Sequence, residues 1–186
     1  MKIENVSKSF GEKKVLKNFN AIFKEGETTA IMGKSGCGKT TLLRIIAGLE
    51  SPDGGAVIKT GERVSVLFQE DRLCESLSAF DNLRLVSNAK SEQIESILSE
   101  VGLGADIHTK VADFSGGMKR RVAIARALLF EAPLVLLDEP FRGLDELTKE
   151  KVASVMRAHL AGKTVLVVTH DSEDAGLLNA VEVIKM

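Results

Sequence analysis

A glycine-rich segment with the pattern G-x-x-x-x-G-K-T, at residues 33–40, constrains the fold of this chain more than any other feature. An apolar, β-branched run at residues 28–32 precedes the segment, and a helical pattern at residues 41–47 follows it. In this context the backbone N–H groups of the loop and of the helix N-terminus can turn toward a phosphate group. The segment therefore predicts a phosphate-binding loop between a buried strand and a helix.

The side chains of this loop have distinct expected tasks. Lys39 can reach the β- and γ-phosphates of a nucleotide, and Thr40 supplies a hydroxyl group for Mg²⁺. We interpret Cys37 as a small residue that the loop tolerates, because phosphate binding requires no nucleophilic thiol. The candidate contacts in the loop are Gly33, Lys34, Ser35, Gly36, Cys37, Gly38, Lys39, Thr40 and Thr41.

Composition limits the class of protein. The 186 residues are 44% hydrophobic, which is enough for one compact domain with a subdomain or two. The net charge is −1 and tryptophan and tyrosine are absent, so no nucleic-acid partner is expected. Two cysteines fit a reducing compartment, and no apolar run approaches the roughly 20 residues that span a bilayer. The sequence thus favours a cytosolic protein, unless a partner holds it at a membrane.

Short β-like runs separated by turn signals fill the first part of the chain. Residues 2–8 and 15–23 predict antiparallel strands that lead into the phosphate loop. Phe10 precedes the first turn, where it could be either a core residue or an aromatic face for a nucleotide base. After the loop and its helix, residues 56–59 and 64–68 also predict strands.

The middle of the chain has a helical pattern. Residues 76–110 predict a small helical insertion in which no chemistry is visible. A second glycine-containing loop, at residues 113–121, begins another helix and could be either an anion site or a simple helix start with a solvated basic face. Gln69 lies in a polar cluster just after the strand expected at 64–68, which could be a ligand contact or a plain loop.

Acidic residues and a histidine follow two later strands. The apolar run at residues 134–137 predicts a strand buried on both faces, and Asp138 and Glu139 follow it. At a strand's carboxyl end Asp138 would face Mg²⁺ and Glu139 would orient or deprotonate water, unless the pair only caps a turn. His170 ends a second buried strand at residues 163–169, where it could contact a γ-phosphate or be structural.

Taken in this order, the segments resemble the nucleotide-binding subunit of an ATP-binding cassette (ABC) transporter over nearly the whole chain. Residues 33–41 are similar to the Walker A motif of that family, and Phe-Ser-Gly-Gly-Met at 114–118 is similar to its signature motif. The signature distinguishes this family from other phosphate-loop proteins. The same resemblance assigns Gln69 to the glutamine loop that touches Mg²⁺, Asp138 and Glu139 to the Walker B pair, Asp145 to the D-loop, His170 to the switch region, Phe10 to adenine stacking, and Ser115, Gly116 and Gly117 to ATP contacts.

The resemblance implies an α/β fold with a P-loop NTPase core built on a mostly parallel sheet, an N-terminal antiparallel β subdomain and a short helical subdomain. Residues 1–186 would form a single ATP-binding cassette domain, with the helical subdomain at about 76–125. ATP and Mg²⁺ would be the cofactors. The implied catalytic residues are Glu139, His170, Gln69 and Lys39, and the implied metal-site residues are Thr40, Gln69 and Asp138.

The resemblance also implies partners. Two copies of the chain would meet head to tail, so that each ATP lies between the Walker A motif of one copy and residues 115–117 of the other. Transmembrane permease subunits, together with an extracytoplasmic solute-binding protein, would hold the dimer on the cytoplasmic face of the cell membrane. Residues 68–73 and 139–141 are similar to importer subunits of the nitrate, sulfonate and taurine type. We expect the permease to bind a groove within residues 70–85, formed by Leu73, Leu77 and Phe80.

Other functions compete with ATP-driven solute import. A soluble mechanochemical ATPase of the same superfamily, acting on nucleic acid, ribosomes or protein assembly, usually carries paired cassettes, coiled-coil insertions or basic extensions, and none is visible in the sequence. A nucleotide-sensing module that does not hydrolyse ATP would lack the Walker B acid, whereas this chain has Glu139. A phosphate-loop kinase for small molecules would have no use for residues 114–118.

Overall fold

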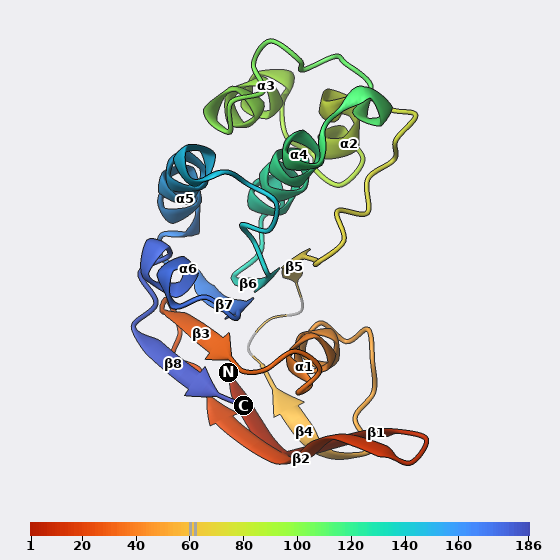
Figure 1. Ribbon diagram of the computed structural model, residues 1–186, viewed down its shortest axis with the longest axis vertical. Coiled ribbons are helices and arrows are strands. Elements are labelled where there is room, and N and C mark those ends of the chain that lie inside the picture. The colour runs from red at the N-terminus through yellow and green to blue at the C-terminus, as the bar shows by residue number, and fades with distance from the viewer. Residues whose placement is uncertain (60, 62) are drawn as a thin grey trace.

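Two β-sheets organise the chain in the computed structural model, which describes residues 1–59, 61 and 63–186 (Figure 1). The first sheet is antiparallel, with the strand order β2 (Lys13–Ile22), β1 (Lys2–Phe10), β4 (Gly54–Ile58). Lys2 in β1 pairs with Ile22 on one side and with Ile58 on the other. The antiparallel strands predicted for the N-terminal region are confirmed.

The second sheet is parallel and carries the predicted phosphate loop. Its strand order is β5 (Val64–Leu67), β6 (Leu134–Asp138), β7 (Thr164–Thr169), β3 (Thr28–Met32), β8 (Glu182–Lys185). Every residue of β6 and β7 is buried. A strand that is covered on both faces needs apolar residues at successive positions, and the sequences LVLL and VLVV provide them.

Successive residues of the parallel sheet face two hydrophobic cores, because side chains alternate between the faces of a sheet. Leu134 and Leu136 of β6 pack on the side of α1 (Lys39–Ile46) and the antiparallel sheet. Val135 and Leu137 pack on the opposite side. Figure 1 shows α1 between the two sheets, so the helix that follows the phosphate loop is held from both sides.

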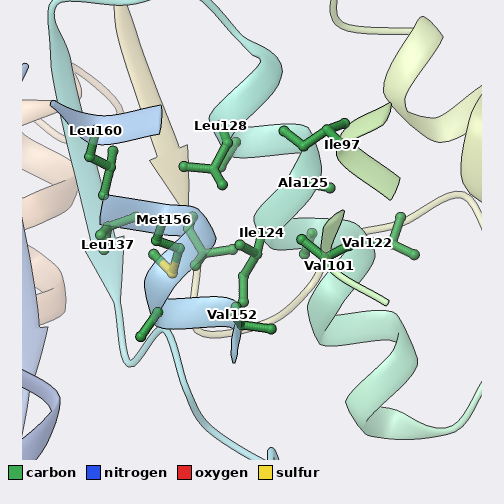
Figure 2. Packing of buried hydrophobic residues seen from close by; sticks show 14 of the residues in the cluster. Ile97, Val101, Val122, Ile124, Ala125, Leu128, Leu137, Val152, Met156 and Leu160 are labelled. Carbon is green, nitrogen blue, oxygen red and sulfur yellow. The ribbon is translucent and has the colours of Figure 1, made fainter. Parts of the chain in front are cut away.

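The second core is built by helices on the other face of the sheet. Figure 2 shows Leu137 of β6 near Ile124 of α4 (Gly116–Leu129) and Met156 of α5 (Glu146–Leu160). These side chains belong to one cluster of buried hydrophobic residues that reaches from the sheet to the outer helices. The position of α4 beside β6 and β5 therefore follows from this packing.

The outer helices lie beyond α4. They are α2 (Ala79–Arg84) and α3 (Ser91–Glu100), followed by a 3-10 turn at Val111–Asp113. The helical pattern predicted for this part of the chain is confirmed. The expected helical subdomain ends at about residue 125, but α4 continues to Leu129. The limits of that subdomain stay a prediction. The last helix, α6 (Ser172–Leu177), follows β7. None of the helices in the described ranges is both long and apolar enough to cross a membrane.

The carboxyl ends of β5, β6, β7 and β3 lie at the same edge of the parallel sheet, because these strands run parallel. The segments that follow them carry Gln69, Asp138 with Glu139, His170 and the phosphate loop. Ligands of open α/β sheets bind at this edge. The fold thus brings together residues that are far apart in the sequence.

Candidate nucleotide-binding site

The phosphate loop turns sharply between β3 and α1. Gly36 and Gly38 have positive φ angles of 78° and 108°, and Gly38 is the N-cap residue of α1. A Cβ atom at Gly38 would lie 2.9 Å from Cγ1 of Val15 and 3.0 Å from its carbonyl oxygen in β2. Glycine is therefore required at Gly38 both by the backbone conformation and by the close approach of β2.

The amine of Lys39 lies inside the curve of this loop. Its Nζ donates to the carbonyl oxygens of Gly33 at 2.7 Å and Lys34 at 3.1 Å, and the residue is only 8% exposed. The carbonyl groups that hold the Lys39 amine are neutral, so they do not pair its charge as a carboxylate would. The loop thus presents a cation at its centre.

Thr40 and Asp138 meet at the edge of the sheet. The Thr40 hydroxyl donates to Oδ2 of Asp138 at 2.8 Å, and Gln69 lines the same cavity. Burial raises the pKa of the Asp138 carboxyl, and the hydrogen bond from Thr40 opposes the rise. A bound cation would offset this cost of burial. Hydroxyl, amide and carboxylate oxygens are the ligand atoms that Mg²⁺ prefers, so the three side chains fit the metal predicted for them.

Glu139 and His170 form a close pair at the neighbouring strand ends. His170 Nδ1 lies 2.9 Å from Oε1 and 3.0 Å from Oε2 of Glu139. Thr169 Oγ1 lies 3.5 Å from Glu139 Oε2 and donates to Oδ2 of Asp174 at 3.0 Å. Asp174 in turn pairs with Lys149 at 2.7 Å. A chain of polar side chains thus extends from Glu139 into the protein.

The Glu139 carboxylate raises the pKa of His170, through their hydrogen bond and through its charge. We expect a titration of the His170 ring by NMR to give a pKa above its ordinary value of 6.5. In Glu139→Gln the value should fall back toward 6.5, because the amide carries no charge. An unchanged titration in Glu139→Gln would contradict the pairing.

The same pair makes a pH-dependent contribution to stability. Because the pKa of His170 is higher in the folded state than in the unfolded state, the pair stabilises the fold fully below about pH 6.5 and loses this effect as the pH rises through the folded-state pKa. His170 has a side chain that is 75% exposed, so the effect is small. Any stability difference between the wild type and His170→Gln should therefore shrink as the pH rises.

A cavity of about 980 Å³ unites these groups. The lining residues that the sequence predicted are Phe10, Ser35, Gly36, Gly38, Lys39, Thr40, Thr41, Gln69, Asp138, Glu139 and His170. Phe10 is 50% exposed, so the interpretation of this residue as part of the core is wrong. Its ring lies on the cavity wall at the end of β1, where a base could stack on it.

Other predicted contacts lie outside this wall. Among the described residues that line the cavity, Gly33, Lys34, Cys37 and Asp145 are not found. Gly33 and Lys34 contact Lys39 through their carbonyl groups. The Asp145 carboxylate caps α5 by accepting from the N–H of Thr148 at 3.0 Å.

The signature segment lies beside the cavity of its own chain, because a Cβ atom at Gly117 would lie 3.4 Å from the carbonyl oxygen of Gly143 in the cavity wall. Ser115 is the N-cap of α4 and accepts from the N–H of Met118 at 3.3 Å, and Ser115 and Gly116 are exposed. Neither these two residues nor Gly117 belongs to the described cavity wall. The exposed start of a 14-residue helix therefore offers its N–H groups outward.

Several lining residues were not predicted from the sequence. They are Lys13, Val15, Phe141, Arg142, Gly143, Glu146, Lys149, Asp171 and Asp174. Asp171 and Asp174 begin α6 directly after His170, a position that could have marked them as part of the site. Lys149 lies in the first turns of α5, and its ion pairs with Asp174 at 2.7 Å and Asp171 at 3.7 Å connect it to the site.

A second cavity, of about 340 Å³, opens on the surface between α1, β5, α2 and α4. Its walls are mostly apolar and consist of Ala47, Leu49, Val64, Ser65, Val66, Phe68, Val86, Arg126, Ala127 and Phe130, and we call it the apolar groove. The groove predicted from Leu73, Leu77 and Phe80 is wrong in one member. Phe80 is only 8% exposed, because it packs in the core with its ring 5.5 Å from that of His108.

Comparison with known proteins decides the family. A family model described as ABC transporter matches residues 16–142, which include the phosphate loop, the signature segment and the acids at the end of β6. The chain belongs to the ABC transporter family. The resemblance drawn from the sequence and the α/β fold class are thereby confirmed.

Two import proteins of the ABC family are similar in sequence. The aliphatic sulfonates import ATP-binding protein SsuB of Burkholderia thailandensis is 38% identical over 185 residues, which cover 94% of this chain and 55% of that protein. The sulfate/thiosulfate import ATP-binding protein CysA of Neisseria meningitidis is 38% identical over 196 residues, covering 93% of this chain and 55% of that protein. The chain thus spans about half the length of these curated relatives.

Solved ABC cassettes share the fold. The dimeric structure of MJ0796, a bacterial ABC transporter cassette, matches with a TM-score of 0.85 and 33% identity over 95% of this chain and 90% of that chain. A dimeric post-hydrolysis state of MJ0796, bound to ADP and Pi, matches with a TM-score of 0.83 and 34% identity over the same shares of the two chains.

Proposed function

We propose that this ABC protein binds and hydrolyses ATP and thereby powers a membrane transporter that imports a solute. The observation that carries the proposal is the single cavity in which Lys39, Thr40, Asp138, Glu139 and His170 come together. Transfer of a phosphoryl group to water requires three kinds of group: a cation that binds the phosphate oxygens, oxygen ligands that bind a metal ion, and a carboxylate that binds the attacking water.

Each group has a task in this proposal. Lys39 binds the β- and γ-phosphates, and the N–H groups of the loop surround them. Thr40 and Gln69, with Asp138, would hold Mg²⁺, which neutralises phosphate charge when bound. Glu139 orients or deprotonates the attacking water, and His170, whose ring lies against that carboxylate, contacts the γ-phosphate.

The site requires a second copy in this proposal. Ser115 and Gly116 at the start of α4 are exposed and do not belong to the described cavity wall of their own chain, so the N–H groups there can bind the ATP held by another copy. Because the γ-phosphate would then lie between two chains, ATP binding would stabilise the dimer and hydrolysis would loosen it. The dimeric state of MJ0796, of matching fold, supports this arrangement.

The proposed import function places permease subunits and an extracytoplasmic solute-binding protein beside the dimer, at the cytoplasmic face of the membrane. The import functions of the sulfonate and sulfate relatives support import over a soluble mechanochemical role. The apolar groove is the surface we propose for the permease. It is bordered by Phe68, next to Gln69, so a bound permease segment would touch the chain beside the nucleotide.

Charge in the apolar groove should prevent this contact. Leu49 and Val86 line the groove and are 53% and 40% exposed, so Leu49→Asp and Val86→Asp should fold. Burying an unpaired carboxylate under a partner is costly, and we expect co-purification of permease subunits to fall by about tenfold or more. The measurement is pull-down from membranes of the source organism with each variant as bait.

A matched control shows whether the loss of permease binding depends on where the new charge lies. Ile22→Asp introduces the same carboxylate at a side chain that is 65% exposed on the antiparallel sheet. This control should capture permease subunits as the wild type does, and the ATPase rate of all three purified variants should stay within about twofold of the wild type. Equal capture by all variants would assign the permease to another surface.

A further inference from the structure

The side chain of Arg120 is only 2% exposed and lies between two segments that border the nucleotide cavity. It comes from α4, which packs beside β5 (Figure 1). One segment is the end of β6, with Asp138 and Glu139. The other is the loop after β5, which contains Gln69.

Three successive carbonyl groups at the end of β6 point at this one guanidinium group. Nη2 donates to the oxygen of Asp138 at 2.8 Å and to that of Glu139 at 2.6 Å, and Nε donates to that of Pro140 at 2.9 Å. In an extended strand successive peptide groups alternate in direction, so three neighbours cannot converge. They converge here because Glu139 has a φ of 47°, in the left-handed region.

A glutamate in this region is strained and persists only where its surroundings hold it. Arg120 provides that support, since it binds the carbonyl groups before, at and after the turn. The turn also sets the direction of the Glu139 side chain, whose carboxylate meets His170 at the cavity. The position of the carboxylate therefore depends on the turn.

The remaining N–H groups of Arg120 bind the loop after β5. Nη1 donates to the carbonyl oxygen of Phe68 at 2.7 Å and to Oδ1 of Asp71 at 3.0 Å, on either side of Gln69 in the sequence. A guanidinium has five N–H donors, and the five acceptors on the two segments match this number. A displacement of the loop would thus alter the same group that holds Glu139.

We propose that Arg120 is a positioning residue for Glu139: it holds the left-handed turn that directs the carboxylate into the cavity, and ties that turn to the loop carrying Gln69. This inference rests on the role proposed for Glu139 in hydrolysis. Because Phe68 borders the apolar groove, a partner bound there would act on Glu139 through Arg120.

The test is Arg120→Lys in the purified full chain. Lysine keeps the positive charge, but its single nitrogen cannot serve five acceptors in a plane. We expect kcat for ATP to fall by about tenfold or more, as a displaced catalytic group does, while the KM for ATP and the affinity for a fluorescent ATP analogue change by less than about threefold. The ATP-bound dimer should accumulate in gel filtration, as expected for Glu139→Gln.

Arg121→Lys is the matched control on the same helix. Arg121 Nη1 also donates to two backbone carbonyl groups, those of Val101 at 3.0 Å and Gly102 at 2.7 Å, but it contacts neither segment that Arg120 joins. Its turnover should stay within about twofold of the wild type. A loss in Arg121→Lys equal to that in Arg120→Lys would overturn the proposal, because it would indicate a general effect on α4.

Two further outcomes would also overturn the proposal. One is ATP turnover by Arg120→Lys at the wild-type rate. The other is a loss of ATP affinity and of the ATP-bound dimer together with the loss of turnover, which would indicate a purely structural role. If Arg120→Lys does not fold, Asp71→Asn is the variant to assay, because it removes the charge of one acceptor of Arg120. We expect its kcat to fall by about threefold while its affinity for ATP is retained. A kcat equal to that of the wild type would overturn the proposal.

Glu139→Gln, assayed beside these variants, separates the two proposals. Wild-type turnover by Glu139→Gln would refute the role of Glu139 and with it the inference. An inactive Glu139→Gln beside a fully active Arg120→Lys would refute the positioning role alone.

Discussion

Glu139→Gln is expected to lower ATP turnover by about 100-fold or more while leaving ATP bound. The amide keeps the size of the side chain and can still contact His170, but it cannot accept a proton from water. Phosphate release measures the turnover, and a fluorescent ATP analogue measures the affinity, which should stay within about threefold of the wild type. Because the bound ATP persists, the dimer should persist with it.

The matched control is Glu150→Gln, at an exposed glutamate on α5 that does not belong to the described cavity wall. The same loss of charge there should leave turnover within about twofold of the wild type. Hydrolysis by Glu139→Gln at the wild-type rate would show that another group activates the water.

Lys39→Met is expected to act on binding instead. Removal of the ammonium group deletes charge-assisted hydrogen bonds to the phosphates, and the affinity for ATP should fall by about 10- to 100-fold. Methionine fills a similar volume, so the loop loses its bonds to the carbonyl groups of Gly33 and Lys34 but not its packing. Isothermal titration with ATP and Mg²⁺ measures the change.

An exposed lysine serves as the control for Lys39. Lys151 lies on α5, outside the described cavity wall, and Lys151→Met should bind ATP as the wild type does. Equal affinities for Lys39→Met and the wild type would mean that the ammonium group does not contact the phosphates.

The parts of the fold that could be predicted from the sequence are those in which local pattern and tertiary environment agree. β6 and β7 consist mainly of apolar runs because they are buried on both faces, and β3 combines β-branched and apolar residues; the strands predicted at these places are confirmed. The phosphate loop could be located because its glycines are required by backbone angles and by close approach, as at Gly38. Both signals lie within short segments of the chain, so they can be recognised in a single sequence.

What could not be predicted depends on contacts between distant segments. Phe80 has the apolar character of a groove residue, yet it is buried in the core, with its ring near that of the exposed His108. Arg120 looks like one member of a basic run on a solvated helix face, but the acceptors that bury it come from residues 68–71 and 138–140. Thr169, Asp174 and Lys149 join Glu139 only through the folded sheet edge.

Ser115 offers the most direct test of the composite site. Aspartate caps a helix as well as serine does, so Ser115→Asp should preserve α4, while its carboxylate would repel a γ-phosphate bound to another copy. The measurement is sedimentation velocity of Glu139→Gln and of Glu139→Gln/Ser115→Asp with ATP and Mg²⁺. The first should sediment as a dimer of the 20.1 kDa chain, and the second as a monomer that still binds ATP. A dimer of equal stability in both would contradict a site shared between two copies.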